Sequence, residues 1–600
     1  MYDTTTDQHA RSNVTVFILS GFFILSGFIQ GLACRLALEY WPRSNQLQTA
    51  LIPAAMIGIV IFCFILQMSV SEQKRHGNLL AALGIGGLFV LLALWYIVQL
   101  PDTTIHPNSW KGVVTVSSIL GGTLLLYFML PFVQSWPERE HGRLRYPDLF
   151  RHSWDNFFVL LVAGLLTCAY WLLIVLWVML FNMVGIRLFR DIFFNATFAW
   201  LSLPVVFALG IHIGLTHDRI ITALRRIVLS LCGWLMPLLA LITLLFGASL
   251  PFTGLTPIWN TGYSTPILLC LIGANIVLLN GIFQDGANPV RYPAPLLRLI
   301  EMAMLLMPVF ALLGAYSTWL RIEQHGLSPK RIYLVILVVI AGSYSFSYAF
   351  AVFRRNKPWM GAIRPANTAI ALLICLSIIL VHSPLINPPA ISARNQLHRL
   401  FSGRTTPEKF DFGALKFQFG IPGEKALQKL STLPQDTPIF KKIADQLAAV
   451  NRADSYYSWK ENQRKNQHSA PPKFTLLGDE HISLQGLAGA IEEDQCQAQP
   501  CVLYPVDLDQ DNQKELILID TTYFLHQMVL FARDNNGNWQ KQGVLGNATD
   551  SKTQKALVQQ LKTGSARPVP AQYQSLQIGT TVYHFVPDRL TETVTGSREK

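Results

Sequence analysis

The sequence predicts a polytopic α-helical membrane domain of about 11 transmembrane helices, followed by a soluble α+β domain with a mainly antiparallel sheet. Long apolar runs recur up to Pro384, and after that point ordinary soluble-looking sequence follows. Only 14% of the residues are charged, against roughly 25% in a typical soluble domain. We therefore expect residues 1–385 to form the membrane domain and residues 386–600 the soluble domain.

The predicted spans follow from the length of the apolar runs. A spanning helix needs about 20 mainly apolar residues, because backbone groups in hydrocarbon must be satisfied within the segment. The runs that meet this condition lie near 14–34, 49–70, 79–100, 112–134, 156–184, 193–215, 227–249, 265–284, 297–320, 332–353 and 366–384. The first five contain no charged residue, which argues against a soluble protein with buried helices. The first run is longer than the apolar region of a signal peptide, so we expect a retained anchor.

The charge distribution predicts sidedness rather than a nucleic-acid partner. The net charge is +12, but basic and acidic residues nearly balance from residue 386 onward, so the excess lies in the membrane domain. If the N-terminus is cytoplasmic, cytoplasmic loops carry about twice as many basic residues as the opposite loops. Eleven spans then place the C-terminal domain outside the cytoplasm, in the periplasm if the cell is Gram-negative. One missed or false span would reverse this orientation.

Cysteine usage agrees with that orientation. Six of the eight cysteines lie in or beside apolar runs, whereas Cys496 and Cys501 stand in the soluble segment CQAQPC. Such a pair can close a small disulfide loop, which persists in oxidising compartments. A reduced pair is the alternative. Zinc is not indicated, because no second cysteine pair lies nearby and the nearest histidines stand at unsuitable spacing.

Ionisable residues are scarce inside the spans. Glu301 is the carboxylate placed well inside one, three residues after Arg298, a spacing that puts both on one helix face. An ion pair at the membrane interface is one interpretation, and a carboxylate that couples ion transport is the other. Prolines inside spans could frame a transport site or simply adapt helix packing. They are Pro53, Pro131, Pro204, Pro237 and Pro308.

The soluble half shows a change from helical to strand patterns. Residues 386–422 are expected to form a linker with short elements, and apolar spacing predicts amphipathic helices near 423–431 and 439–450. The segments KFTLL, CVLYPVDL, ELILID, QMVLFARD, YQSLQIG and TVYHFVP are typical of strands. The segment DNNGNW at 534–539 has the chemistry of a hairpin turn.

One acidic segment, VDLDQDNQKELILID at 506–520, carries a metal-binding hypothesis. Carboxylates at alternate positions can wrap a hard cation such as Ca²⁺, which would be structural here. The segment resembles the calcium loops between strands of integrin-type propeller repeats, although only one copy is present. An acidic turn without an ion is the alternative. The candidate ligands are Asp507, Asp509, Asp511 and Glu515.

Several segments resemble a bacterial multi-pass inner-membrane family catalogued as a domain of unknown function. In the membrane half these are YPDLFRHSWDNFFVLLVAGLLTCAYWLLIVLWVMLFNMVGI, WLMPLLALITLLF and RIEQHGLSPKRIYLVILVV, and the tail adds ISARNQLHRLFSG, GIPGEKALQKL and VDLDQDNQKELIL. The resemblance implies an integral inner-membrane protein without an assigned reaction, so no catalytic residue is carried over.

The sequence therefore leaves three function classes open. The first is an envelope-associated scaffold or sensor, or a component of a transport assembly, with the bilayer and other envelope proteins as partners. The second is a secondary transporter that uses the kinked helices near Glu301. A membrane-embedded enzyme is the third, and the chain shows no hydrolase, metalloprotease or phosphate-loop motif that favours it.

Overall fold

The structure is a computed structural model. It describes residues 4–41, 47–70, 75–99, 113–136, 144–260, 263–287, 292–354, 359–467, 474–477, 482–491, 501–510, 512–519, 528–534, 537–545, 561, 576–578 and 581–583. The chain forms two compact units, Met1–Trp459 and Lys460–Lys600. Within the described residues, 11 helices are long and apolar enough to cross a membrane, which confirms the predicted polytopic architecture.

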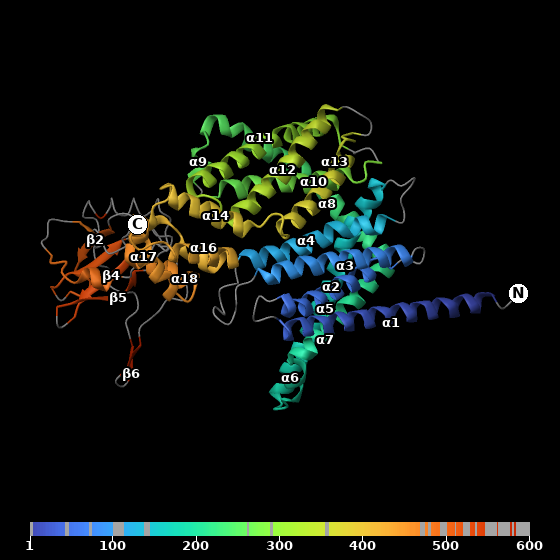
Figure 1. Cartoon of the computed structure of the whole chain (residues 1–600), viewed down its shortest axis with the longest axis horizontal. Helices are drawn as coiled ribbons and strands as arrows, with labels where there is room; N and C mark the ends of the chain where they lie inside the picture. The colour runs from blue at the N-terminus through green and yellow to red at the C-terminus, as the bar shows by residue number, and fades with distance from the viewer. Residues whose placement is uncertain are drawn as a thin grey trace, which may run out of the picture. The chain divides into compact units, whose positions relative to one another are not determined.

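The spanning helices follow one another in the first unit, with two short helices between them (Figure 1). They are α1 (Thr4–Glu39), α2 (Leu47–Met68), α3 (Arg75–Val98), α4 (Val113–Ser135), α5 (Tyr146–Met183), α7 (Ala196–Thr216), α8 (Asp218–Thr253), α10 (Ser264–Phe283), α11 (Ala294–His325), α12 (Pro329–Phe353) and α13 (Ile363–Val381). The short helices are α6 (Leu188–Phe193) and α9 (Thr256–Asn260).

Three of these helices begin well before the expected apolar runs, and one of them is α1, which starts at Thr4 instead of residue 14. The run at 156–184 becomes α5 from Tyr146, and the run at 227–249 becomes α8 from Asp218. Apolarity marks only the part of a helix that lies in hydrocarbon, whereas backbone hydrogen bonding continues through charged residues at the boundary. The extra turns therefore bring polar side chains into the bundle, and they become important for the candidate site.

The spanning helices pack in two groups. In one group α1 contacts α2 and α7, α2 contacts α3, and α5 contacts α4 and α7. In the other group α8, α10 and α11 contact one another, and α12 contacts α11 and α13. Contacts of α4 with α13 and of α5 with α8 connect the groups, and Figure 1 shows the blue and the green-to-yellow helices gathered accordingly.

Small residues set the closest helix approaches. A Cβ added at Gly31 of α1 would lie 2.3 Å from the carbonyl oxygen of Trp200 in α7. A Cβ added at Gly210 of α7 would lie 2.5 Å from Cα of Ala163 in α5. Glycine is therefore required at both contacts, as is common where helices associate in a bilayer without a strong hydrophobic drive between them.

Neutral polar side chains join other helices. In the second group Asn280 donates to the Tyr348 hydroxyl at 2.7 Å, and that hydroxyl donates to Asn367 Oδ1 at 2.8 Å. Asn367 in turn donates to the Tyr146 hydroxyl at 2.9 Å. In the first group His212 of α7 lies 3.2 Å from Ser20 Oγ of α1. These residues satisfy one another in an apolar surrounding, where an unpaired polar group is costly.

The segment after the last span is a packed helical domain rather than a linker. It contains α14 (Pro388–Phe401), the 3₁₀ turn η1 (Pro407–Lys409), α15 (Phe412–Gln418), α16 (Gly420–Ser431) and α17 (Pro438–Arg452), which we call the platform. Helices α16 and α17 confirm the two predicted amphipathic helices. The platform core includes Phe412 and Leu415, and the platform packs on Trp459 at the start of α18 (Tyr456–Gln467).

The platform belongs to the same compact unit as the spans. Its α14 packs on α12, and Asn387 at the start of α14 donates to Gln99 Oε1, just beyond α3, at 3.3 Å. The α14 side chains also bind the turn between α11 and α12. We call the end of the spans that contacts the platform the platform end. The boundary between a membrane domain and a soluble domain at residues 385/386 stays a prediction.

The second unit holds a five-stranded sheet in the order β1-β2-β3-β4-β5. Strands β2 to β5 pair antiparallel, while β1 pairs parallel with β2. The unit also holds a short helix, α19 (Leu487–Ala490), and the β6–β7 hairpin. The strands are β1 (Phe474–Leu476), β2 (Cys501–Val506), β3 (Glu515–Ile519), β4 (Met528–Arg533), β5 (Trp539–Leu545), β6 (Leu576–Ile578) and β7 (Thr581–Tyr583).

The α+β class with a mainly antiparallel sheet is thus confirmed. The core of the sheet is formed by alternate residues such as Leu503, Leu516 and Phe531. In the predicted turn, Gly537 has a φ of 80° and its N–H donates to the Asp534 carbonyl. This turn connects β4 to β5 as the sequence pattern indicates.

Candidate functional site

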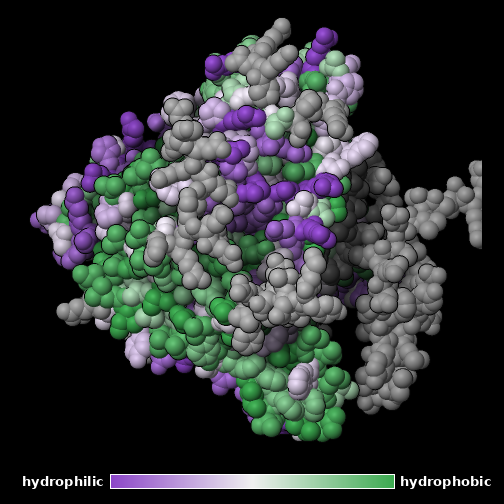
Figure 2. Space-filling view, turned by 90° about the vertical axis from the view of Figure 1, so that its right-hand side faces the viewer, coloured by the Kyte–Doolittle hydropathy of each residue, from purple (hydrophilic) through white to green (hydrophobic). Residues whose placement is uncertain are grey.

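A polar cavity of about 510 Å³ lies at the end of the spans opposite the platform end. Its wall contains Asn78 at the start of α3, whereas the other end of α3 leads to Gln99 beside the platform. The ends of α2, α4 and α7 and the beginnings of α5 and α8 complete the wall. We call this end of the spans the cavity end. Figure 2 looks onto this side and shows hydrophilic surface gathered beside a broad hydrophobic area.

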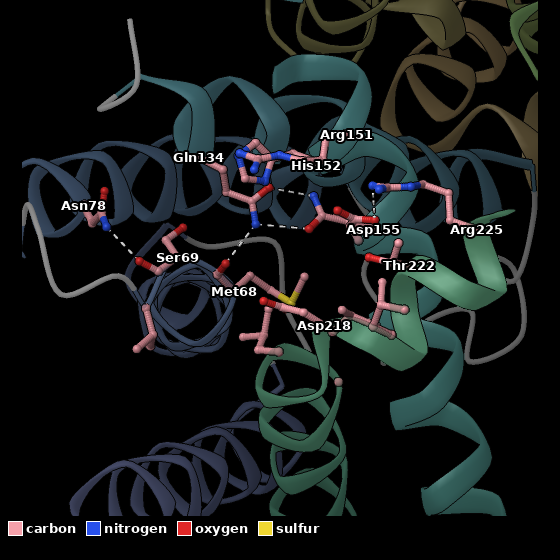
Figure 3. A pocket seen from close by; sticks show the side chains of 16 residues that line it. Met68, Ser69, Asn78, Gln134, Arg151, His152, Asp155, Asp218, Thr222 and Arg225 are labelled. Carbon is pink, nitrogen blue, oxygen red and sulfur yellow. Dashed lines mark hydrogen bonds and ion pairs between the residues drawn. The ribbon is translucent and has the colours of Figure 1, made fainter. Parts of the chain in front are cut away.

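Two amide side chains form the centre of the cavity wall. Asn156 of α5 donates to Gln134 Oε1 of α4 at 2.8 Å, and Gln134 Nε2 lies 3.0 Å from Asn156 Oδ1. Gln134 Nε2 also donates to the Met68 carbonyl at 2.8 Å, and Asn78 donates to the Ser69 carbonyl at 2.7 Å (Figure 3). The last carbonyls of α2 lack helical partners, so these amides complete the end of that helix.

Charged side chains stand beside the amide pair. Arg225 of α8 forms an ion pair with Asp155 of α5, with Nη1 2.6 Å from Oδ1. Both side chains are mostly buried, with exposures of 21% and 28%. Arg151 and His152 lie about one turn before Asp155 on α5, and Asp218 faces the cavity from the start of α8 (Figure 3). This ion pair holds the Arg225 guanidinium and the Asp155 carboxylate in one relative geometry.

This arrangement is suited to holding a small polar or charged molecule. It offers donors from Arg151, Arg225 and the amides, and acceptors from Asp155 and Asp218. The imidazole of His152 lies 3.4 Å from the Arg151 guanidinium. The geometry therefore provides recognition by hydrogen bonds and charge.

The structure places Glu301 away from this cavity, in α11. Its carboxylate accepts a 2.8 Å hydrogen bond from the Trp359 indole N–H. Within the described part of the chain Glu301 forms no ion pair with Arg298, which is exposed. The structure therefore shows Glu301 as a hydrogen-bond acceptor for Trp359.

The acidic segment forms the turn between β2 and β3. One carboxylate oxygen from each of Asp507, Asp509 and Glu515 lies within 4.8 Å of the others. Glu515 accepts from the Leu508 N–H at 2.7 Å. Burial raises the Glu515 pKa, the bond from Leu508 opposes this, and the Asp509 carboxylate adds to the rise.

Three of the four residues predicted as calcium ligands thus share one cluster. The fourth, Asp511, lies outside the described residues. Asp507 also accepts from the Gln510 N–H at 2.7 Å and from the Asn512 N–H at 3.1 Å, so it shapes the turn itself. Oxygen donors suit Ca²⁺, and calcium binding stays a prediction.

The structure describes one cysteine of the predicted pair. Cys501 begins β2 and is buried, whereas Cys496 lies outside the described residues. The disulfide between them stays a prediction. The cysteines of the membrane half are free thiols. They are Cys34, Cys63, Cys168, Cys232, Cys270 and Cys375.

Sequence reasoning missed the cavity residues. Asp155 and Asn156 stand side by side where an apolar run begins, and Gln134 closes another run. Polar residues at both ends of adjacent runs are the signal that could have found them. They look like ordinary boundary residues in a linear sequence, because their pairing depends on how α4 and α5 pack.

Comparison with known proteins identifies the family. A family model described as "Domain of unknown function (DUF4153)" matches residues 51–417. The chain belongs to this family. The match covers α3 to α14 completely and reaches α15, so it includes the cavity and part of the platform. No curated protein and no solved structure matches the DUF4153 chain.

Proposed function

We propose that this DUF4153 protein is an envelope-associated scaffold or sensor of the bacterial inner membrane, or a component of a transport assembly. In this proposal the N-terminus is cytoplasmic and residues 386–600 face the periplasm. The observation that supports it best is the attachment of the platform to the spans. A platform fixed in this way can pass on a movement of the spans, or hold a partner at a fixed position relative to the membrane.

The attachment uses side chains of α14 and the backbone of the turn between α11 and α12. Asn395 Oδ1 accepts from the Leu327 N–H at 2.8 Å, and Gln396 donates to the Leu327 carbonyl at 2.8 Å. Arg399, which is buried, donates to the Gln324 carbonyl at 3.0 Å. Contacts from two successive turns hold α14 in a single orientation, in contrast to a flexible linker.

Sidedness is supported by the position of charges relative to the two ends. Arg151 and Arg225 line the cavity end, where the loop charge rule expects the cytoplasm. Single cysteines test this. We expect Thr432→Cys on the platform to react with a membrane-impermeant maleimide in intact cells, and Ala223→Cys in α8 to react only after permeabilisation. The unaltered chain, with its span cysteines, is the background control, and the opposite pattern would refute the orientation.

The scaffold proposal is tested by proximity labelling from the full chain in intact cells. We expect a recurring set of envelope proteins that Arg399→Ala loses, because the platform is released. Arg394→Ala removes an exposed arginine one turn away on the same helix and should keep the set. Equal labelling by both variants at equal expression would remove the support that the platform gives to this function.

A carrier is the second candidate, favoured by the polar cavity at 510 Å³. The alternative centred on Glu301 has Pro308 seven residues later in the same helix. Proteoliposomes loaded with a pH-sensitive dye test both sites. An ion-coupled carrier at Glu301 should lose flux in Glu301→Gln, and a carrier at the cavity should lose it in Asp155→Asn. Absence of flux in the unaltered chain would leave the scaffold proposal as the better one.

A further inference from the structure

A second cavity, of about 680 Å³, lies between α4, α12 and α13 near the platform end. It is a groove rather than an enclosed chamber. Leu120 and Leu124 of α4, Leu337 of α12 and Ile374 of α13 line its apolar length. Its volume falls within the roughly 300–1,000 Å³ of ligand pockets.

The apolar walls face the outside of the helix bundle. Leu120 and Leu337 are 58% and 54% exposed, although both sit within spanning helices. Side chains that are exposed at this depth meet lipid rather than water. The groove therefore opens sideways toward acyl chains, and a water-soluble ligand would find few hydrogen-bonding partners along it.

Polar groups gather at one end of the groove. Ser117 donates to the Tyr333 hydroxyl at 2.9 Å, and the Tyr333 ring stacks on His382 at 6.1 Å between centroids. Gly121 makes room for this imidazole, because a Cβ there would lie 2.7 Å from His382 Cε1. Lys330 completes this end from the first turn of α12 and is exposed.

Positive charge at this end comes from two sources. Lys330 carries a full charge, and the N-terminus of the 25-residue helix α12 adds the positive end of its dipole. Ser328 caps the helix by accepting from the Arg331 N–H. An apolar groove with a cation at its membrane-surface end matches an amphiphile with an anionic head.

We propose that this groove binds one anionic phospholipid from the leaflet at the platform end. An acyl chain lies along Leu120, Leu337 and Ile374, and the phosphate lies at Lys330 and the first turn of α12. Tyr333 and His382 flank the headgroup. The site is separate from the polar cavity, which lies at the other end of the spans.

The platform contributes to the same site. Gln418, the last residue of α15, lines the mouth of the groove. Two residues later, Gly420 has a φ of 58°, and a Cβ there would lie 2.9 Å from the Gln99 carbonyl oxygen. A bound headgroup would therefore touch both the spans and the platform, so the lipid should stabilise their attachment.

Native mass spectrometry of the purified full chain tests the proposal, with phosphatidylglycerol or phosphatidylcholine added in detergent. We expect the unaltered chain to retain phosphatidylglycerol preferentially. Lys330→Gln should reduce that retention about five-fold, since one surface lysine contributes about 1 kcal/mol toward an anionic lipid. Lys429→Gln removes an equal charge from an exposed position on α16 and should change nothing.

A second variant tests the acyl-chain part of the groove. Leu337→Trp fills the groove from a half-exposed position, so it should fold, and it should reduce retention of both lipids. The thermal midpoint of each variant, measured without added lipid, checks folding. Equal retention of both lipids by the unaltered chain would overturn the proposal. Unchanged retention in Lys330→Gln, or in Leu337→Trp, would overturn it as well.

Discussion

The guanidinium of Arg399 in α14 donates to the carbonyl of Gln324, near the end of α11, over 3.0 Å. This bond joins the platform to the turn that connects two spanning helices. Gln324 precedes Gly326, whose φ of 72° lets the chain leave α11. A Cβ at Gly326 would lie 2.6 Å from Arg399 Cδ, so the side chain fits over a glycine.

Removing the Arg399 side chain should loosen the platform. Arg399→Ala leaves the Gln324 carbonyl without this donor and opens space beneath α14, which should cost about 1.5–3 kcal/mol. Arg394→Ala, at an exposed position, should change stability by no more than about 0.5 kcal/mol. Limited proteolysis of the full chain in nanodiscs measures this, and equal cleavage rates in the two variants would contradict it.

Lys416 holds the end of α17. Its ammonium donates to the carbonyls of Val450, Asn451 and Ala453 at 2.9, 3.0 and 2.9 Å. The last carbonyls of a helix lack helical partners, and a cation there also favours the helix dipole. The side chain is 6% exposed, so it replaces water at this helix end.

Lys416→Met should therefore destabilise the platform by about 2–3 kcal/mol, because at similar side-chain volume it removes the donor to three carbonyls, of which those of Val450 and Ala453 are in buried bonds. Lys429→Met at an exposed position of α16 is the matched control and should be near neutral. Hydrogen exchange of α17 amides in the full chain is the measurement. Protection of α17 that stays the same in Lys416→Met would show that these bonds contribute little.

The acidic turn predicts a specific pattern of calcium binding. If Ca²⁺ binds, calorimetry of the full chain should show heat that Asp509→Asn removes, because this exposed carboxylate belongs to the cluster of candidate ligands. Asp507→Asn should also disturb the turn, since Asp507 accepts from the Gln510 and Asn512 N–H groups. Asp445→Asn on α17 is the charge-matched control. Absence of heat in the unaltered chain would favour the ion-free turn.

The stability of the platform end should fall in mild acid because of His382. Burial lowers the His382 pKa below its usual 6.5, and the hydrogen bond to the Ile378 carbonyl only partly opposes this. Lys330 and Tyr333 line the same groove. As the pH falls through 6.5, the unfolded chain takes up a proton that the folded chain binds less readily, so folding stability decreases.

The thermal midpoint in nanodiscs between pH 7.5 and 5.5 measures this effect. We expect a smaller decrease on acidification in His382→Gln than in the unaltered chain, because glutamine does not titrate. His398→Gln, an exposed histidine on α14, should keep the full decrease. Identical pH dependence in His382→Gln and the unaltered chain would assign the acid sensitivity to other groups.

The sequence alone determined the membrane architecture, because hydrocarbon demands long apolar helices that satisfy their own backbone groups. It also determined the amphipathic helices α16 and α17 and the strands of the sheet, since in water the apolar face of each must be buried against the rest of the protein. It brought Asp507, Asp509 and Glu515 into one candidate group, because they are neighbours along the chain.

Only the tertiary structure decided which polar groups meet. Gln134 pairs with Asn156, and Glu301 with Trp359, across distances in sequence that no local pattern encodes. It also turned residues 386–422 from an expected linker into the first half of a docked platform. In a bilayer the lipid-facing side of a helix must be apolar, and the side that packs on other helices is largely apolar as well. The sequence therefore shows that a segment lies in the membrane, but it does not show which helices it contacts.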